Sequence, residues 1–108
     1  MQPYEITVSD VAQLRQTGDA FVLLDVREPW EAATAVIDGS VLIPMAELPA
    51  RANLELDPDG RIVVLCHHGA RSLSVTAWLR REGFDHAQSM AGGIDQWSRE
   101  IDGTVPRY

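Results

Sequence analysis

The chain has 108 residues, the size of one ordinary domain, so we expect a single domain over residues 1–108. Its hydrophobic fraction of 45% can form a core without a disulfide or a metal, and its single cysteine excludes an internal disulfide framework. The chain contains no lysine, which excludes Walker-type phosphate binding and Schiff-base chemistry. Sixteen acidic residues against nine arginines give a net charge of −7, which disfavours nucleic acid and anionic membranes as partners.

The charge is unevenly distributed along the chain. Between Arg61 and Arg81 there are four arginines and no acidic residue, so this segment carries +4 and the remainder carries −11. The only cysteine, Cys66, lies inside it. A locally positive segment predicts stabilisation of an anion or a thiolate, although an exposed arginine-bearing helix would give the same count. The sequence also lacks a membrane-spanning apolar run and a signal peptide, so we expect a cytoplasmic protein without a membrane partner.

Short apolar runs of strand length alternate with stretches of helical periodicity, which indicates an α/β fold with a parallel sheet. We predict five strands, at residues 6–8, 21–26, 41–43, 62–65 and 87–90. Helices are predicted from an N-cap at Ser9 to a terminator at Gly18 and from about Trp30, with Pro29 in its first turn. Further along the chain we predict a short helix and a loop within 45–56, a turn at 57–60, helices over 72–82 and 94–99, and a tail over 104–108.

Polar residues follow two of these strands. Asp25 and Arg27 come at the end of the second strand, and Cys66 comes directly after the fourth. In an open parallel sheet, ligands bind beyond the carboxyl ends of the strands. We therefore expect these three residues to lie at the functional edge of the sheet.

The segment after the fourth strand carries the chemistry. A tight loop there can direct the backbone N–H groups of residues 67–72 at the Cys66 sulfur, and Gly69 permits a backbone conformation that other residues resist. The following helix adds the positive end of its dipole, and Arg71 adds a full charge. Together they predict a stabilised thiolate.

Each loop residue also has a structural interpretation. Cys66 could be a buried apolar side chain, and Ser72 could be an N-cap. His67 and His68 are adjacent and cannot easily face one ion, and His86 is the only other histidine, so we expect no metal site and no cofactor. We expect both loop histidines on the rim, with their side chains outward.

Taken together, four motifs resemble those of a rhodanese domain, the sulfurtransferase fold, from about Tyr4 to Tyr108. The motifs are Asp25-Val26-Arg27-Glu28 with Glu31, Ile37-Asp38-Gly39-Ser40 leading to Ile43-Pro44, Cys66-x-x-Gly69-x-Arg71-Ser72, and Gly92-Gly93-Ile94 with Trp97. The resemblance implies a three-layer sandwich in which helices flank a five-stranded parallel sheet. The sequence departs from the family at Ala35-Val36, where Gly-His is frequent, and we expect altered packing there.

The resemblance implies that Cys66 is the catalytic nucleophile of a loop over residues 66–71. It would attack the sulfane sulfur of thiosulfate or another persulfide donor, become a persulfide, and pass the sulfur to cyanide, a thiol or a protein. By the same resemblance, His67, His68, Gly69, Ala70, Arg71 and Ser72 would form the substrate-binding loop.

Two further expectations come from the resemblance. Arg71 would orient the anionic donor, and Asp25 and Arg27 would orient the loop rather than take part in the reaction. The ending from Ser98 to Tyr108 is similar to rhodanese domains that are attached to adenylating enzymes of sulfur-carrier pathways, which indicates a sulfur-carrier or adenylating-enzyme partner.

Two other functional classes remain as alternatives. A cysteine phosphatase or arsenate reductase would also use a loop around a cysteine, but such phosphatases have five residues between cysteine and arginine, whereas this chain has four. A rhodanese-like binding or regulatory module without turnover is the second alternative. The cysteine, glycine and arginine of the loop are all present here and favour the enzyme.

Overall fold

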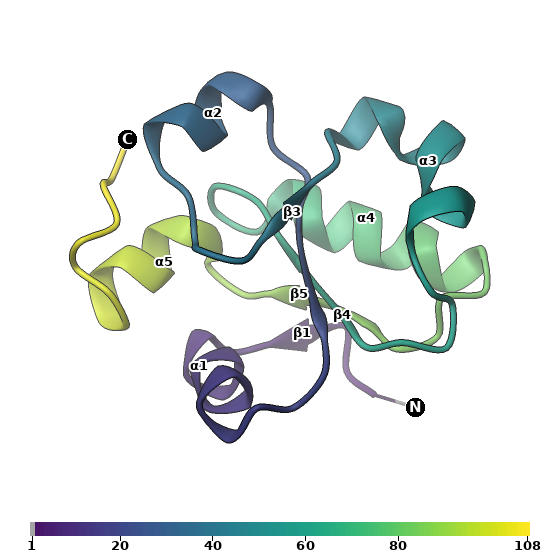
Figure 1. The fold of residues 1–108 in the computed structure, drawn as a ribbon, viewed down its shortest axis with the longest axis horizontal. Helices are drawn as coiled ribbons and strands as arrows, with labels where there is room; N and C mark the ends of the chain where they lie inside the picture. The colour runs from purple at the N-terminus through teal and green to yellow at the C-terminus, as the bar shows by residue number, and fades with distance from the viewer. Residues whose placement is uncertain (1) are drawn as a thin grey trace.

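The computed structural model describes residues 2–108, and its centre is a sheet of five parallel strands in the order β1-β5-β4-β2-β3 (Figure 1). The pairing of β4 with both β2 and β5 places the strand before Cys66 in the middle of the sheet. This confirms the predicted α/β class and five-stranded parallel sheet. The strands are β1 (Glu5–Ile6), β2 (Val22–Asp25), β3 (Val41–Leu42), β4 (Ile62–Leu65) and β5 (Ala87–Met90).

Helices form the two outer layers: α1 and α5 cover one face of the sheet, while α3 and α4 cover the other (Figure 1). The short helix α2 follows β2, and a 3₁₀ turn, η1, precedes α3. The helices are α1 (Val8–Thr17), α2 (Pro29–Thr34), η1 (Met45–Glu47), α3 (Leu48–Glu55), α4 (Ala70–Arg81) and α5 (Gly93–Glu100).

Alternating side chains of β4 divide the core between the two faces. Ile62 and Val64 pack with α3 and α4, whereas Val63 and Leu65 pack with α1 and α5. All four side chains are buried, as a parallel strand covered on both faces requires. Because side chains alternate along a strand, Cys66 faces the side of α4, the helix that follows it.

Two helix starts differ from the predictions. The first helix is capped by Thr7 rather than Ser9, because the Thr7 hydroxyl accepts from the Asp10 backbone N–H at 3.1 Å. The fourth helix begins at Ala70 with Gly69 as its N-cap, so Ser72 lies inside the first turn and is not the cap. There its backbone N–H is unused by the helix and is free to point at the sulfur.

Other element boundaries also differ from the predictions. Three strands are shorter than predicted: β1 covers residues 5–6 rather than 6–8, β2 covers 22–25 rather than 21–26, and β3 covers 41–42 rather than 41–43. Residues 45–55 are wholly helical rather than a short helix with a loop. The predicted tail folds back onto the domain, where Val105 is buried in the core beside α5. There the Ser98 hydroxyl of α5 donates to the Val105 carbonyl, seven residues further along the chain.

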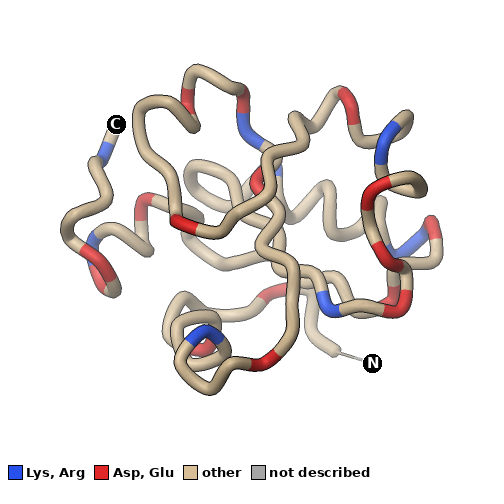
Figure 2. The backbone as a smooth tube through the Cα atoms, viewed as in Figure 1, with Lys and Arg blue, Asp and Glu red and all other residues tan. Residues whose placement is uncertain are grey.

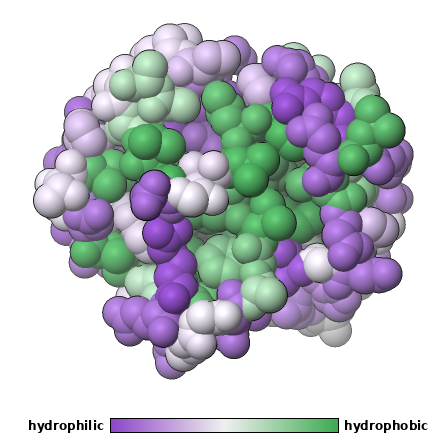
Figure 3. All heavy atoms as spheres, viewed as in Figure 1, coloured by the Kyte–Doolittle hydropathy of each residue, from purple (hydrophilic) through white to green (hydrophobic). Residues whose placement is uncertain are grey.

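Acidic positions are spread over all sides of the domain rather than gathered in one patch (Figure 2). Apolar side chains gather across the middle of the face that carries the edge strand β3 (Figure 3), where Val41 and Met45 are exposed. Within residues 2–108, no helix has the length and hydrophobicity needed to cross a membrane.

Candidate active site

Cys66 begins the loop between β4 and α4, and it is only 1% exposed (Figure 1). The backbone N–H groups of Gly69 and Ser72 donate to its Sγ at 3.1 and 3.3 Å. Sγ also lies 3.4 Å from the Ser72 hydroxyl. Of the N–H groups expected to face the sulfur across residues 67–72, these two do so at hydrogen-bond distance. Their dipoles form a small nest that stabilises negative charge on the sulfur.

The curvature of the loop depends on Gly69, which has a φ of 110°. A side chain on this residue would be strained in that conformation, and its Cβ would lie 3.3 Å from the backbone nitrogen of Gly92. The close approach connects the loop to the turn before α5. Gly69 is therefore required by both the backbone angle and the packing.

The first turn of α5 forms hydrogen bonds with the backbone of the cysteine loop. The backbone N–H groups of Ile94 and Asp95 donate to the carbonyl oxygens of Cys66 and His67, at 2.9 and 3.1 Å. Gly93 has a φ of 62°, and a Cβ on it would collide with those same two carbonyl groups. The glycine pair that carried part of the sequence resemblance thus lets the start of α5 come close enough to bind the loop backbone.

A buried pair of hydroxyls lies below the sulfur. Ser72 Oγ donates to the Gly69 carbonyl at 3.2 Å and lies 2.7 Å from Ser89 Oγ on β5. Both serines are completely buried. The sequence analysis did not identify Ser89, because it lies inside a strand and no motif marks it.

Arg71 makes a bidentate ion pair with Glu31 of α2. Its two terminal nitrogens donate to the two carboxylate oxygens at 2.7 and 2.8 Å. This contact lowers the pKa of Glu31 from 4.5 to about 2 and holds the pKa of Arg71 above its ordinary value, to which the charge of Cys66 also contributes. The sequence analysis quoted Glu31 as part of a motif but assigned it no role.

Tyr108 lies over the loop and is the residue that the sequence analysis missed most clearly. Its ring stacks on His67, with ring centroids 3.9 Å apart and an angle of 5° between the planes. Its hydroxyl donates to Glu31 Oε2 at 2.7 Å and accepts from Arg27 at 2.9 Å. Because these contacts join residues 77 to 81 positions apart, no local signal in the sequence could have indicated them.

Asp25 and Arg27 form a buried ion pair at the carboxyl end of β2. The guanidinium donates to both carboxylate oxygens of Asp25, at 2.9 and 2.7 Å, and to the carbonyl of Ala35 at 2.7 Å. Neither side chain is among the hydrogen-bond partners of the Cys66 sulfur. Their contacts hold α2, and with it Glu31, in place beside the loop.

The two loop histidines stack on each other with centroids 3.9 Å apart. His68 is exposed, as expected for the rim, but the expectation of an outward side chain is wrong for His67, which is half-buried and covered by Tyr108. Burial lowers the pKa of His67 below its ordinary value. Ligand atoms of His67, His68 and Asp95 lie within 4.8 Å of one another. The Asp95 carboxylate accepts from Arg107 at 3.0 Å and lies 3.3 Å from Arg99, so its negative charge is already compensated, which weakens it as a metal ligand.

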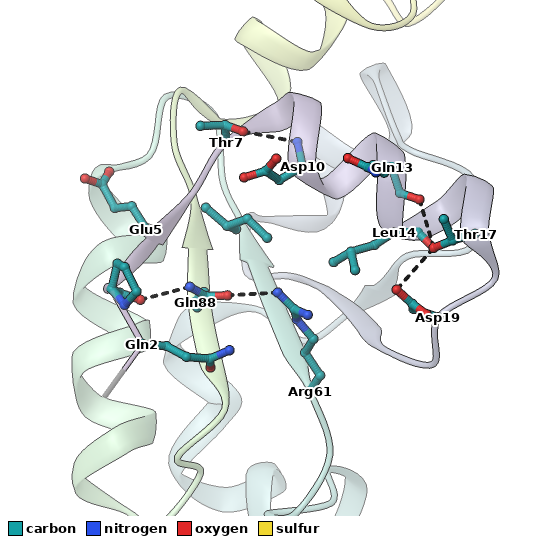
Figure 4. Close-up of a pocket in the computed structure, with 12 residues that line it drawn as sticks. Gln2, Glu5, Thr7, Asp10, Gln13, Leu14, Thr17, Asp19, Arg61 and Gln88 are labelled. Carbon is teal, nitrogen blue, oxygen red and sulfur yellow. Dashed lines mark hydrogen bonds between the residues drawn. The ribbon is translucent and has the colours of Figure 1, made fainter.

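A hollow of about 490 Å³ lies along the edge strand β1, between β1, α1 and the segment before β4 (Figure 4). Two polar side chains of its lining are hydrogen-bonded: Arg61 donates to Gln88 at 3.2 Å, and Gln88 donates to the Pro3 carbonyl at 3.0 Å. Arg61 precedes β4 whereas Cys66 follows it, so this arginine lies at the other end of the strand from the cysteine loop.

Comparison with known proteins gives a consistent picture. The family model described as "Rhodanese-like domain" matches residues 7–100. A sulfurtransferase from Allochromatium vinosum is 32% identical over 95 residues, which cover 88% of each chain. The adenylyltransferase and sulfurtransferase MOCS3-1 of Zea mays is 35% identical over 95% of this chain and 23% of that protein. Several other curated relatives are also longer, and this chain spans between 26% and 52% of them.

Solved structures agree with the sequence comparison. A rhodanese-related protein from Thermoplasma volcanium has 31% sequence identity and a TM-score of 0.82, and the match covers 92% of this chain and 94% of that one. The family match extends from the cap of α1 to the end of α5, and it includes the cysteine loop and the glycine turn behind it. The chain therefore belongs to the rhodanese-like domain family.

Proposed function

We propose that this chain is a sulfurtransferase that carries a sulfane sulfur on Cys66 as a persulfide. The observation that carries the proposal is the pair of backbone N–H groups, of Gly69 and Ser72, directed at a buried sulfur at the carboxyl end of a central strand. Relatives that are named sulfurtransferases support it. The residues that act are those of the loop over residues 66–72.

In the first step the Cys66 thiolate attacks the outer sulfur of a donor such as thiosulfate. A bond forms between Sγ and that sulfur, the sulfur–sulfur bond of the donor breaks, and its electron pair leaves with sulfite. The product is a Cys66 persulfide whose terminal sulfur carries one negative charge. The N–H nest and the positive end of the α4 dipole stabilise this charge.

In the second step a nucleophile removes the terminal sulfur and regenerates the thiolate. The chain has no second cysteine that could resolve the persulfide internally. The acceptor must therefore be another molecule, such as a thiol, cyanide or a protein. Relatives named adenylyltransferase and sulfurtransferase, and one named a putative sulfur carrier protein, support an acceptor in a sulfur-carrier system.

Mass spectrometry of the intact protein tests the proposal directly. After thiosulfate treatment and removal of excess donor, the protein should gain about 32 Da, one sulfur atom, and should lose it on addition of cyanide with release of thiocyanate. Cys66→Ala should show neither change. Ser74→Ala, a substitution on the exposed side of α4, serves as the matched control and should behave as the unsubstituted protein.

The same experiment separates the alternative functions. A protein that gains no mass with any sulfane donor but hydrolyses an aryl phosphate would be a cysteine phosphatase. A protein that does neither, while remaining folded, would be a binding module. Either result would overturn the proposed sulfur transfer.

A further inference from the structure

The positive side chains around the cysteine loop are already paired with carboxylates. Arg71 binds Glu31, and Arg27 binds Asp25 in a buried pair. On the α5 side, the exposed arginines Arg99 and Arg107 share the single carboxylate of Asp95, which compensates only one of their two charges. Of the four arginines in the locally positive sequence segment, the one in the cysteine loop, Arg71, is therefore compensated by a carboxylate in the folded chain.

Glu31 is held firmly in its charged form. Its Oε1 accepts from Arg71 and from the Glu28 backbone N–H, the latter at 3.0 Å, and its Oε2 accepts from Arg71 and from Tyr108. The carboxylate is only 4% exposed. With a pKa of about 2, it remains ionised over the whole pH range in which sulfur transfer can be assayed.

The pairing has a direct consequence for an anionic donor. An unpaired arginine would attract a dianion more strongly than a monoanion, because the Coulomb energy is proportional to charge. When a carboxylate lies against that arginine, most of this preference disappears. The rest of the chain, with its net charge of −7, opposes a dianion further.

We propose that Glu31 is a specificity-determining residue, which neutralises Arg71 and so selects monoanionic sulfane-sulfur donors over the dianion thiosulfate. The assignment rests on the proposed persulfide chemistry and names the donor class for it. Glu31 acts through Arg71 and is therefore a positioning residue that does not itself touch the donor.

Methanethiosulfonate provides a matched monoanionic donor. The Cys66 thiolate attacks its outer sulfur, the sulfur–sulfur bond breaks, and methanesulfinate leaves with the electron pair, whereas thiosulfate releases sulfite by the same step. Both donors leave the same persulfide on Cys66. The two leaving groups differ, but this difference cancels when variants are compared, so the change in the ratio of the two kcat/KM values reports the effect of donor charge.

The test is Glu31→Gln, which removes the charge and keeps a side chain of the same size. We expect it to raise kcat/KM for thiosulfate relative to methanethiosulfonate about fivefold, the effect of one unit charge near a partly exposed pair. Asp59→Asn is the control, because Asp59 lies in the turn before β4 at the opposite end of that strand from Cys66. Asp59→Asn removes the same charge as Glu31→Gln and should change the ratio of the two kcat/KM values by less than about twofold.

A purely structural role for Glu31 would lower both kcat/KM values together and leave their ratio unchanged, which would overturn the assignment.

The double variant E31Q/R71Q gives an independent measurement of the same ratio and avoids leaving Arg71 without its partner. Because it replaces a neutral pair with a neutral pair, its ratio should return to within about twofold of the original. A ratio that falls well below the original would show that Arg71 binds thiosulfate directly, and it too would overturn the assignment.

Failure of the underlying function gives a different result. If the unsubstituted protein gains no sulfur atom from either donor, the persulfide chemistry is wrong and the assignment of Glu31 is wrong with it. If both donors load Cys66 and the ratio does not respond to Glu31→Gln, only the assignment of Glu31 is wrong.

Discussion

At the scale of single residues, Glu31 connects parts of the chain that are far apart in sequence. It closes the capping box of α2, pairs with Arg71 of the cysteine loop, and accepts from Tyr108. Because its carboxylate accepts four hydrogen bonds in a buried position, the folded state strongly favours the charged form. The stability of the domain should therefore depend on the ionisation of this one side chain.

The pKa of Glu31 falls from 4.5 to about 2 on folding, so its contribution to stability is fully present above pH 4.5 and is lost as the pH falls towards 2. We expect the difference in free energy of unfolding between the unsubstituted protein and Glu31→Gln to shrink across this window. The change should be on the order of 2 kcal/mol, allowing for solvent screening of the partly exposed Arg71. Urea unfolding at a series of pH values measures it.

Glu5→Gln is the control for this measurement, since Glu5 is an exposed carboxylate on β1. Its difference from the unsubstituted protein should stay nearly constant between pH 5 and pH 2. A Glu31→Gln difference that is equally independent of pH would contradict the assigned role of the Glu31–Arg71 pair in stability.

Tyr108 is the second single residue on which the stability of the domain should depend. Tyr108→Phe keeps the ring that stacks on His67 but removes the hydroxyl between Arg27 and Glu31. Because two charged groups each lose a hydrogen bond, we expect a loss of about 1–3 kcal/mol in the free energy of unfolding. Chemical denaturation compares this variant with Tyr4→Phe, an exposed tyrosine that should change stability by less than about 0.5 kcal/mol. Equal losses in the two variants would argue against the network.

At the scale of elements, the site depends on how α5 meets the cysteine loop. The first turn of α5 donates to the backbone carbonyls of Cys66 and His67, and this requires two adjacent glycines with positive φ. The loop is thus held by backbone contacts on one side and by the first turn of α4 on the other. Its shape is a property of three elements, β4, α4 and α5, acting together.

Gly93→Ala tests this arrangement. The new methyl group would collide with the carbonyls of Cys66 and His67 at an already strained φ, so the loop has to move. We expect a loss of at least about 2 kcal/mol in the free energy of unfolding and a slower gain of one sulfur atom from thiosulfate. Gly103→Ala is the control, because open space surrounds that position. Normal persulfide formation by Gly93→Ala would show that α5 does not shape the loop.

At the scale of the whole molecule, the chain has a net charge of −7, and its acidic positions are dispersed along the backbone rather than gathered in one segment (Figure 2). Screening by salt weakens the repulsion between this charge and an approaching anion. We expect kcat/KM for thiosulfate to rise about two- to threefold between low and physiological ionic strength, and that for methanethiosulfonate to rise less. Stopped-flow or steady-state assays with added sodium chloride measure both. A decrease with salt would mean that the site attracts dianions, against the neutralisation of Arg71 by Glu31 proposed above.

The sequence by itself determined the fold class, the central strand and the position of the cysteine. Alternation of apolar runs with helical periodicity indicates a parallel sheet, and β4, β5 and the start of α2 lie where the local pattern predicts them. These features depend on residues that are close in sequence, so local propensity and periodicity are enough to predict them. The glycine of the loop and the position of Cys66 after a buried strand belong to the same class of local signal.

The tertiary structure decided which charges meet. The sequence predicts a positive loop with Arg71 available to an anion, but the folded chain places Glu31 against Arg71 and stacks Tyr108 on His67. These partners lie about 40 residues from each other, and no periodicity connects them. Electrostatic interactions depend on distance in space, so a charge count along the chain indicates which ions are present, and only the fold determines which of them remain unpaired.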